Sequence, residues 1–265
     1  SEMCIRDRMN AVRIAELPRE REWITAHIHT PVVTVGTVVA LRSAVGGAGA
    51  TTLAVALAHH LAKRGRRTAV VDLDPHGGLD VVAGLEGAPG PRWPDVDLAA
   101  LSGADLAQWL PSTSDVAVLS SDLRRAPVPI DADVVAALAH TCDVVVLDAP
   151  TAGTDHVLDS ISTDFECTVL PNTVRAVSVA GQRATGRSRR SHGLVVRSVS
   201  GASLEPMAIA EVLDTPLWAC LPTDARVVEQ IEQGLGPSTI SLGGYTRAVL
   251  HLANRILGDD AAAST

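Results

Sequence analysis

One short segment constrains the fold of this chain more than any other: a glycine-rich loop between an apolar run and a helical pattern. Residues 44–52 read AVGGAGATT. The preceding run Thr37–Arg42 (TVVALR) is rich in β-branched residues, which predicts a buried strand. The following stretch Thr51–Arg64 has leucines four residues apart, which predicts a helix that ends at Gly65. Strand, glycine turn and helix in this order indicate one unit of an α/β protein.

Strand-like and helical segments alternate along the rest of the chain. Further strands are predicted at Thr68–Leu73, Asp115–Leu119, Cys142–Leu147, Glu166–Leu170, Leu194–Val199 and Leu217–Leu221. Further helices are predicted at Asp131–His140, Val174–Arg183, Glu205–Leu213, Asp224–Gln233 and Tyr245–Leu257. This alternation predicts an α/β fold with a doubly wound, mostly parallel sheet and helices on both faces. The ligand site of such a sheet lies at the carboxyl ends of its strands.

Length, charge and cysteine content narrow the class of protein. The 265 residues suffice for one large domain, which we place at residues 37–258. We expect residues 1–36 to be a linker or the remnant of an upstream domain, and residues 259–265 to be a disordered tail. The net charge of -8 argues against a surface that tracks DNA. The four cysteines are scattered and have no C-x-x-C spacing, which indicates reduced thiols in a cytoplasmic protein.

The glycine loop is a candidate phosphate-binding loop. Glycines let successive backbone N–H groups turn toward an anion, and the helix that begins there adds its dipole. The candidate binding residues are Gly46, Gly47, Ala48, Gly49, Ala50, Thr51 and Thr52. The hydroxyl of Thr51 is also a candidate ligand of Mg²⁺. For this segment taken alone, a tight turn that binds nothing is the alternative.

Two further predicted strands lead into aspartates. Val71–Asp80 reads VDLDPHGGLD, and Val144–Pro150 reads VVVLDAP. An apolar strand that ends in an aspartate such as Asp148 is typical of the Walker B pattern, whose carboxylate holds Mg²⁺ through water. The alternative for the first segment is a turn with helix-capping aspartates. The second pattern is weak alone, because many strands end in aspartate.

Together, the three segments resemble the ParA/MinD superfamily of P-loop ATPases. The deviant Walker A motif of that superfamily reads K-G-G-x-G-K-T-T, and its glycines and threonines match residues 46–52. Residues 72–77 are similar to the D-x-D-P-x-G stretch of the same proteins. The resemblance implies ATP and Mg²⁺ as ligands, with Thr51 and Asp148 at the metal. It also implies that Asp74 positions the attacking water and that Asp72 belongs to the same nucleotide and metal network.

Both lysines of that motif are absent, because Val45 and Ala50 stand in their places. Lys63 is the only lysine of the chain and lies ~18 Å along the predicted helix at 1.5 Å per residue. Arg42 is the only nearby cation in the sequence, and its direction is not fixed by the pattern. A hydrogen bond to a charged group contributes about 1.5–3 kcal/mol. We therefore expect weak ATP binding and still weaker stabilisation of the transition state.

Within the superfamily, the chain resembles most the septum-site-determining or CpaE/TadZ-like branch. The segments that carry this resemblance are 77–80 (GGLD), 84–86 (GLE), 92–94 (RWP), 221–224 (LPTD) and 233–235 (QGL). Such proteins place division or pilus machinery at chosen cell sites, and relatives often carry a receiver-like domain upstream. The resemblance implies protein partners from the division or pilus/secretion machinery, and it allows a homodimer.

Three functions stay open at this point. The first is a positioning or regulatory protein that hydrolyses ATP slowly or not at all. The second is a working Mg-dependent ATPase that uses backbone amides and an arginine in place of lysine. The third is a metabolic enzyme on a similar fold, which the lack of an added catalytic motif disfavours.

The last predicted helix, Tyr245–Leu257, is the candidate segment for membrane attachment. Its apolar face is small, its basic residues are few, and Asp259 and Asp260 follow at once, which anionic lipid would repel. We therefore predict that this helix packs on its own domain. The protein is then expected in the cytoplasm, recruited to the inner face of the membrane only through partners.

Overall fold

The computed structural model describes residues 3–6, 12–15, 35–98, 105–122, 124–151, 155–184, 191–237 and 243–258. The chain divides into two compact units, Ser1–Thr34 and Val35–Thr265. In the first unit, β1 (Met3–Arg6) pairs antiparallel with β2 (Val12–Ala15). No pattern in the sequence predicts this hairpin, which lies within the expected linker at residues 1–36.

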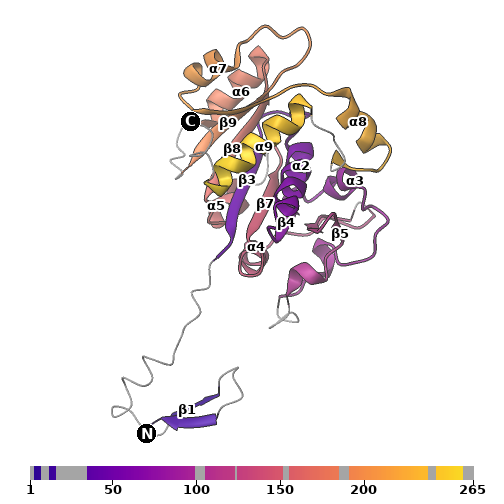
Figure 1. The fold of residues 1–265 in the computed structure, drawn as a ribbon, viewed down its shortest axis with the longest axis vertical. Coiled ribbons are helices and arrows are strands. Elements are labelled where there is room, and N and C mark those ends of the chain that lie inside the picture. The colour runs from indigo at the N-terminus through magenta and orange to yellow at the C-terminus, as the bar shows by residue number, and fades with distance from the viewer. Residues whose placement is uncertain are drawn as a thin grey trace. The chain divides into compact units, whose positions relative to one another are not determined.

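An eight-stranded sheet forms the centre of the second unit (Figure 1). Its strands are β3 (Thr37–Ser43), β4 (Thr68–Asp72), β5 (Ser112–Thr113), β6 (Val116–Leu119), β7 (Val144–Ala149), β8 (Phe165–Pro171), β9 (His192–Arg197) and β10 (Leu217–Leu221). They lie in the order β10-β9-β8-β3-β7-β4-β6-β5. Every neighbouring pair is parallel except β5 and β6. The predicted doubly wound, mostly parallel sheet is confirmed.

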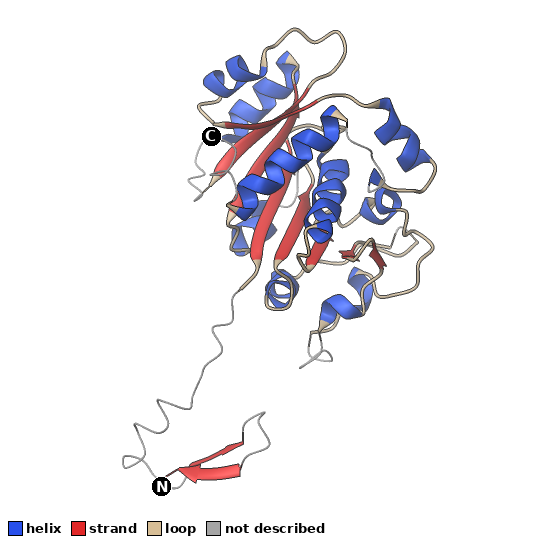
Figure 2. Ribbon diagram, in the orientation of Figure 1, coloured by secondary structure: helices blue, strands red, loops and turns tan. Residues whose placement is uncertain are grey.

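Helices cover both faces of this sheet (Figure 2). One layer holds α2 (Ala50–Lys63), α3 (Leu79–Ala83), α8 (Ala225–Glu232) and α9 (Gly244–Leu257). The other holds α4 (Ala132–Ala139), α5 (Asp155–Ser160), α6 (Val174–Ala184), α7 (Pro206–Val212) and the short 3-10 helices η1 (Trp93–Asp95) and η2 (Leu106–Gln108). This two-sided covering explains the unbroken apolar runs in the sequence, because the inner strands are buried on both faces.

The central strand β3 shows how one sequence serves both layers. Val39 and Leu41 belong to the core that α2 and α9 cover, whereas Val38 and Ala40 belong to the core beneath α4. Successive side chains of a strand point to opposite faces, so alternate residues of one apolar run fill different cores. The next residue, Arg42, therefore points away from α2.

The C-terminal helix α9 lies beside α2 on the sheet (Figure 1). It buries Val249, Leu252, Ala253 and Ile256 in the same core as the leucines of α2. Helix-spaced apolar residues that are buried in this way provide the main stabilisation of an amphipathic helix. The predicted packing of this helix on its own domain is confirmed. Among the described residues, no helix has both the length and the apolar character needed to cross a bilayer.

Candidate functional site

The three segments selected from the sequence meet at one edge of the sheet. Strands β3, β7 and β4 are neighbours, and each is followed by one of the segments. Asp148 of β7 lies opposite Leu41 of β3 on one side and opposite Asp72 of β4 on the other. Because these strands are parallel, their carboxyl ends bring the glycine loop and both aspartate segments together.

The glycine loop has the backbone of an anion-binding turn. Gly47 and Gly49 have φ values of +72° and +94°, which residues other than glycine rarely adopt. A Cβ atom added at Gly46 or Gly47 would meet nothing within 4 Å, so the loop opens onto free space. Gly49 caps α2 without a side-chain hydrogen bond, and the first turn of α2 contains no acidic residue. The first N–H groups of α2 are thus left for an acceptor in front of the helix.

The residues at the two lysine positions pack inward. Ala50 is 1% exposed and belongs to the core under α2, and Val45 packs against two of the core clusters. Neither position offers a charge to the loop. At the far end of α2, Lys63 closes the helix, as the spacing in the sequence predicted.

Asp148 and Asp72 form a pair of buried carboxyl groups beside the loop. Burial, aided by the charge of Asp72 and opposed by a hydrogen bond from Thr51, raises the pKa of Asp148 to about 7. Burial also raises the pKa of Asp72 to about 6. The opposing hydrogen bonds come from the backbone N–H of Asp74 (2.9 Å), the Ser120 hydroxyl (2.9 Å) and the backbone N–H of Leu79 (3.2 Å).

These two carboxyl groups and Thr51 suit a magnesium ion that also binds phosphate. Mg²⁺ takes oxygen ligands and is commonly held by one or two carboxylates together with phosphate oxygens and water. Within the described residues there is no group of three or more His, Cys, Asp or Glu side chains that could hold a metal by themselves. The site therefore fits Mg²⁺ together with a nucleotide better than it fits a metal ion alone.

Asp74 lies further toward solvent than the other two aspartates. Its side chain is 37% exposed, and its Oδ1 atom accepts a hydrogen bond from the backbone N–H of His76 at 2.9 Å. It is near enough to Asp148 for its charge to raise the pKa of that residue. This places Asp74 at the mouth of the site, where a water molecule has access.

Residues after β6 and in η1 hold the Asp72–Asp74 segment in place. Beside the Ser120–Asp72 bond, the hydroxyl of Ser121 donates to the backbone oxygen of Asp74 at 3.1 Å. The indole N–H of Trp93 donates to the backbone oxygen of Asp72 at 2.7 Å. Our sequence reasoning missed Ser120 and Ser121. Both directly follow a predicted strand, so the rule that sites lie at strand ends could have found them.

Several segments that carry the resemblance to the CpaE-like branch contact one another. Arg92 Nε and Asp80 Oδ2 are 3.5 Å apart in a buried ion pair, and Arg92 Nη2 donates to the backbone oxygen of Leu85 at 2.9 Å. A Cβ atom at Gly84 would lie only 2.2 Å from the backbone oxygen of Gly234. These segments thus support α3, which follows the Asp72–Asp74 segment.

The cation nearest to the loop is not the one that the sequence suggested. Arg42 Nε lies 3.2 Å from Glu166 Oε1 in a buried ion pair on the face away from α2. Arg197, the last residue of β9, instead donates from Nη2 to the backbone oxygen of Gly47 at 3.0 Å. Arg42, the cation that is near the loop in sequence, thus points away from it, and Arg197 reaches the loop in the fold. Arg197 comes from 150 residues along the chain and from a strand that β8 separates from β3.

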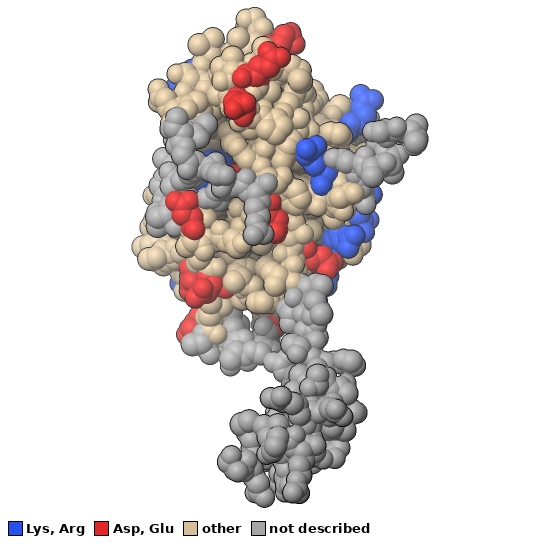
Figure 3. All heavy atoms as spheres, turned by 90° about the vertical axis from the view of Figure 1, so that its left-hand side faces the viewer, with Lys and Arg blue, Asp and Glu red and all other residues tan. Residues whose placement is uncertain are grey.

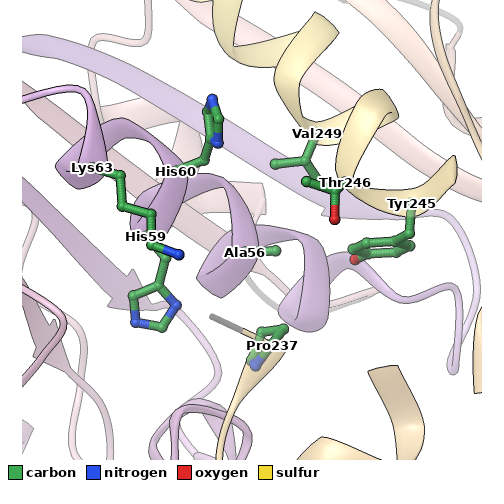
Figure 4. A pocket seen from close by; sticks show the side chains of 8 residues that line it. All are labelled: Ala56, His59, His60, Lys63, Pro237, Tyr245, Thr246 and Val249. Atoms are coloured by element: carbon green, nitrogen blue, oxygen red, sulfur yellow. The ribbon is translucent and has the colours of Figure 1, made fainter. Parts of the chain in front are cut away.

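A small cavity lies between α2 and α9 (Figure 4). Its volume of about 40 Å³ is enough for a few water molecules but not for a nucleotide. His59 and His60 reach its surroundings and point in different directions, as expected for adjacent helical residues. Burial lowers the pKa of His59 to about 4. The cavity is therefore too small for a nucleotide, and the open loop edge stays the candidate site.

The comparison with protein families agrees with this geometry. A family model described as "CbiA: CobQ/CobB/MinD/ParA nucleotide binding domain" matches residues 39–237. An uncharacterised protein of Mycobacterium tuberculosis (strain H37Rv) is 36% identical over 233 residues, which cover 84% of this chain and 63% of that protein. This chain thus spans less than two thirds of the length of that relative. The chromosome-partitioning ATPase Soj of Thermus thermophilus is 28% identical over 211 residues, covering 72% of this chain and 83% of Soj.

Solved structures share the fold at low sequence identity. The septum site-determining protein MinD from Pyrococcus horikoshii, complexed with Mg-ADP, superposes with a TM-score of 0.67 at 19% identity. The match covers 86% of this chain and 98% of that one. The MinC:MinD cell division protein complex of Aquifex aeolicus gives a TM-score of 0.69 at 20% identity, covering 84% and 96% of the two chains.

Proposed function

Because the chain belongs to the CobQ/CobB/MinD/ParA nucleotide binding domain family, we propose that it is a nucleotide-binding regulator that hydrolyses ATP slowly or not at all. We assign it the role of a septum-site-determining or CpaE-like positioning protein. It would act in localising the division site or the pilus/secretion machinery. ATP with Mg²⁺ would be its ligand and would set the state that its partners bind.

One contrast within the site carries this proposal. The proposed oxygen ligands for Mg²⁺ lie together, since Thr51 hydrogen-bonds Asp148 and Asp72 lies in register beside it. The lysine positions, by contrast, hold the apolar residues Val45 and Ala50. Binding uses both the metal and the backbone amides, whereas hydrolysis depends in addition on cations that stabilise charge on the transferred phosphoryl group. The site thus retains more of what binding needs than of what hydrolysis needs.

Each site residue has a role in this proposal. The backbone N–H groups of residues 46–52 bind the phosphates, and Thr51 and Asp148 hold Mg²⁺. When bound, Mg²⁺ neutralises phosphate charge. Asp72, held by Ser120, keeps Asp148 and the loop in position. Asp74 orients a water molecule only to the extent that hydrolysis occurs.

Surface features support protein partners in preference to DNA or membrane. The net charge is -8, and on the face shown in Figure 3 acidic side chains are spread over the surface, whereas the basic side chains gather toward one side of it. Val249, Leu252, Ala253 and Ile256 of α9 are buried in the core and are not available to lipid, and Leu250 alone is an exposed large apolar residue of this helix. We propose partners from the division or pilus/secretion machinery, a homodimer as the working form, and a cytoplasmic protein that reaches the membrane through partners.

Two measurements test the proposal. Isothermal titration calorimetry with ATP and with ADP, each with and without Mg²⁺, should show binding that Mg²⁺ strengthens. A phosphate-release assay beside a lysine-bearing ParA or MinD protein should show negligible turnover. Turnover equal to that of the lysine-bearing protein would refute the inactive assignment. Absence of nucleotide binding would refute the role of ATP as a ligand.

A second function, a working ATPase, is favoured by one observation. Arg197 reaches the loop and supplies a cation that the sequence motif lacks. The turnover assay decides between the two functions, since they share the same binding site.

A further inference from the structure

We propose that Arg197 binds the phosphates of the nucleotide and supplies the positive charge that the absent lysines would otherwise provide. The inference rests on the proposed nucleotide binding at the glycine loop. In this proposal Arg197 is a binding residue that lies at the end of β9, outside the loop motif.

The position of Arg197 relative to the loop is the first observation. Its Nη2 atom donates to the backbone oxygen of Gly47 at 3.0 Å. Its Cδ and Nη1 atoms lie 3.6 and 3.9 Å from the point where a Cβ atom of Gly49 would be. The guanidinium therefore spans the loop from Gly47 to the cap of α2, where an anion on the helix N-terminus would lie.

The unused hydrogen-bonding capacity of Arg197 is the second observation. An arginine has five N–H donors in a planar fork that matches phosphate oxygens. The contact with Gly47 uses one of them, and the Nε atom is buried and has no hydrogen-bond partner among the described residues. A buried donor without an acceptor is unfavourable, so an acceptor at this place would be stabilised.

The charge of Arg197 is the third observation. Five other arginines of the described residues have a carboxylate partner, in the pairs Arg42–Glu166, Arg67–Asp105, Arg92–Asp80, Arg125–Asp95 and Arg226–Asp224. In the described part of the chain, Arg197 forms no ion pair with a carboxylate. A cation that faces a phosphate loop without a counter-ion is suited to an anionic ligand.

The arginine is held near the loop before a ligand arrives. Its hydrogen bond to the backbone oxygen of Gly47 fixes one end of the guanidinium. Tyr245, at the start of α9, is buried and close enough to Arg197 for the arginine charge to act on its hydroxyl. Holding the side chain in place in advance reduces the entropy lost on binding.

A purely structural role is the alternative, in which Arg197 only braces the loop through Gly47. Three variants separate the two roles. Arg197→Gln removes the charge and keeps a polar side chain, and Arg197→Lys keeps the charge without the planar fork. Arg66→Gln changes the net charge equally at an exposed site before β4, at the opposite edge of the sheet, and serves as the matched control.

The probes are ATP, sodium tripolyphosphate and adenosine, each titrated calorimetrically at fixed ionic strength with Mg²⁺. A lost hydrogen bond to a charged group corresponds to roughly ten- to a hundredfold in affinity. We expect Arg197→Gln to bind ATP and tripolyphosphate weaker by about this factor, with unchanged affinity for adenosine and an unchanged melting temperature. Arg197→Lys should lie between this variant and the wild type, and Arg66→Gln should bind as the wild type does.

Equal tripolyphosphate affinity of wild type and Arg197→Gln would overturn the inference, and so would a loss confined to adenosine. If Arg197→Gln does not fold, Arg197→Lys decides: wild-type tripolyphosphate affinity would support a role of the charge, and a lowered melting temperature with lost affinity would assign a bracing role. If the wild type binds neither ATP nor tripolyphosphate, the proposed function fails as well. Binding by the wild type with no effect of Arg197→Gln refutes the inference alone.

Discussion

Neutralising Asp148 is expected to stabilise the protein in the absence of ligand. Its carboxyl group is buried, and its pKa rises from 3.8 to about 7 in the folded state. Above pH 7 the folded protein must hold a charge that the unfolded chain exposes to water. Asp148→Asn removes this charge while its amide oxygen can still accept the hydrogen bond from Thr51.

The size of the effect follows from the pKa values. A shift of about three pH units at 1.36 kcal/mol each gives a ceiling of roughly 4 kcal/mol at pH 7.5. For an acid with a raised folded pKa, this penalty is absent at low pH and grows as the pH rises from about 4 to 7. Between pH 5.5 and 7.5 the variant should therefore gain roughly 2 kcal/mol of unfolding free energy relative to the wild type.

Urea denaturation of both proteins at pH 5.5, 6.5 and 7.5, without Mg²⁺ or nucleotide, measures this difference. Comparing variant with wild type cancels other titrating groups such as His59. Glu211→Gln, at an exposed position of α7, is the control for a changed net charge. A difference between Asp148→Asn and wild type that does not change with pH, or that shrinks as the pH rises, would refute the reasoning.

The remaining predictions concern three other groups. The pKa of His59 is lowered to about 4 in the folded state, so the contribution of this residue to the unfolding free energy should fall by about 2 kcal/mol as the pH drops from 7 to 4.5. In urea titrations His59→Gln should therefore gain about this much relative to the wild type over that range, and an unchanged difference between the two proteins would contradict the prediction. Thr51→Ala should weaken the effect of Mg²⁺ on ATP binding in calorimetry, while Thr113→Ala, distant in β5, should not. Ala50→Lys should tighten ATP binding about tenfold or more if the variant melts as the wild type does; unchanged affinity in a folded variant would show that the loop cannot direct a lysine to the phosphates.

The sequence predicted the central elements because their signals are local. The run Thr37–Arg42 and the leucines of α2 carry periodicities that a buried strand and a packed helix require. The sheet-edge location of Asp72, Asp148 and the loop then followed from the rule for parallel strands. The β1–β2 hairpin and the two-residue β5 were missed, because strands this short contain too few residues for a pattern.

The direction of the arginines could not be predicted, because it depends on contacts between distant parts of the chain. Arg42 is adjacent to the loop in sequence, but strand alternation and Glu166 direct it to the other face. Arg197 reaches the loop only because β9 lies two places from β3 in the strand order. The spacing of residues along the chain predicts neither the direction of Arg42 nor the approach of Arg197 to the loop. The roles of the loop residues, Asp74 and the metal ligands stay predictions until binding is measured.

The hydrogen bond between Trp93 and Asp72 gives this protein an intrinsic optical probe of its site. The indole is buried and bonded directly to the backbone of the carboxylate segment. Trp109, by contrast, is 65% exposed, and Trp218 lies beneath Arg255 at the far side of the sheet order, at 5.0 Å. With Trp23, Trp109 and Trp218 replaced by phenylalanine, a shift of the emission maximum on adding Mg²⁺ and ATP would report movement of the segment that contains Asp72 and Asp74. Ligand-driven rearrangement can thus be followed in a stopped-flow fluorimeter, without attaching a dye.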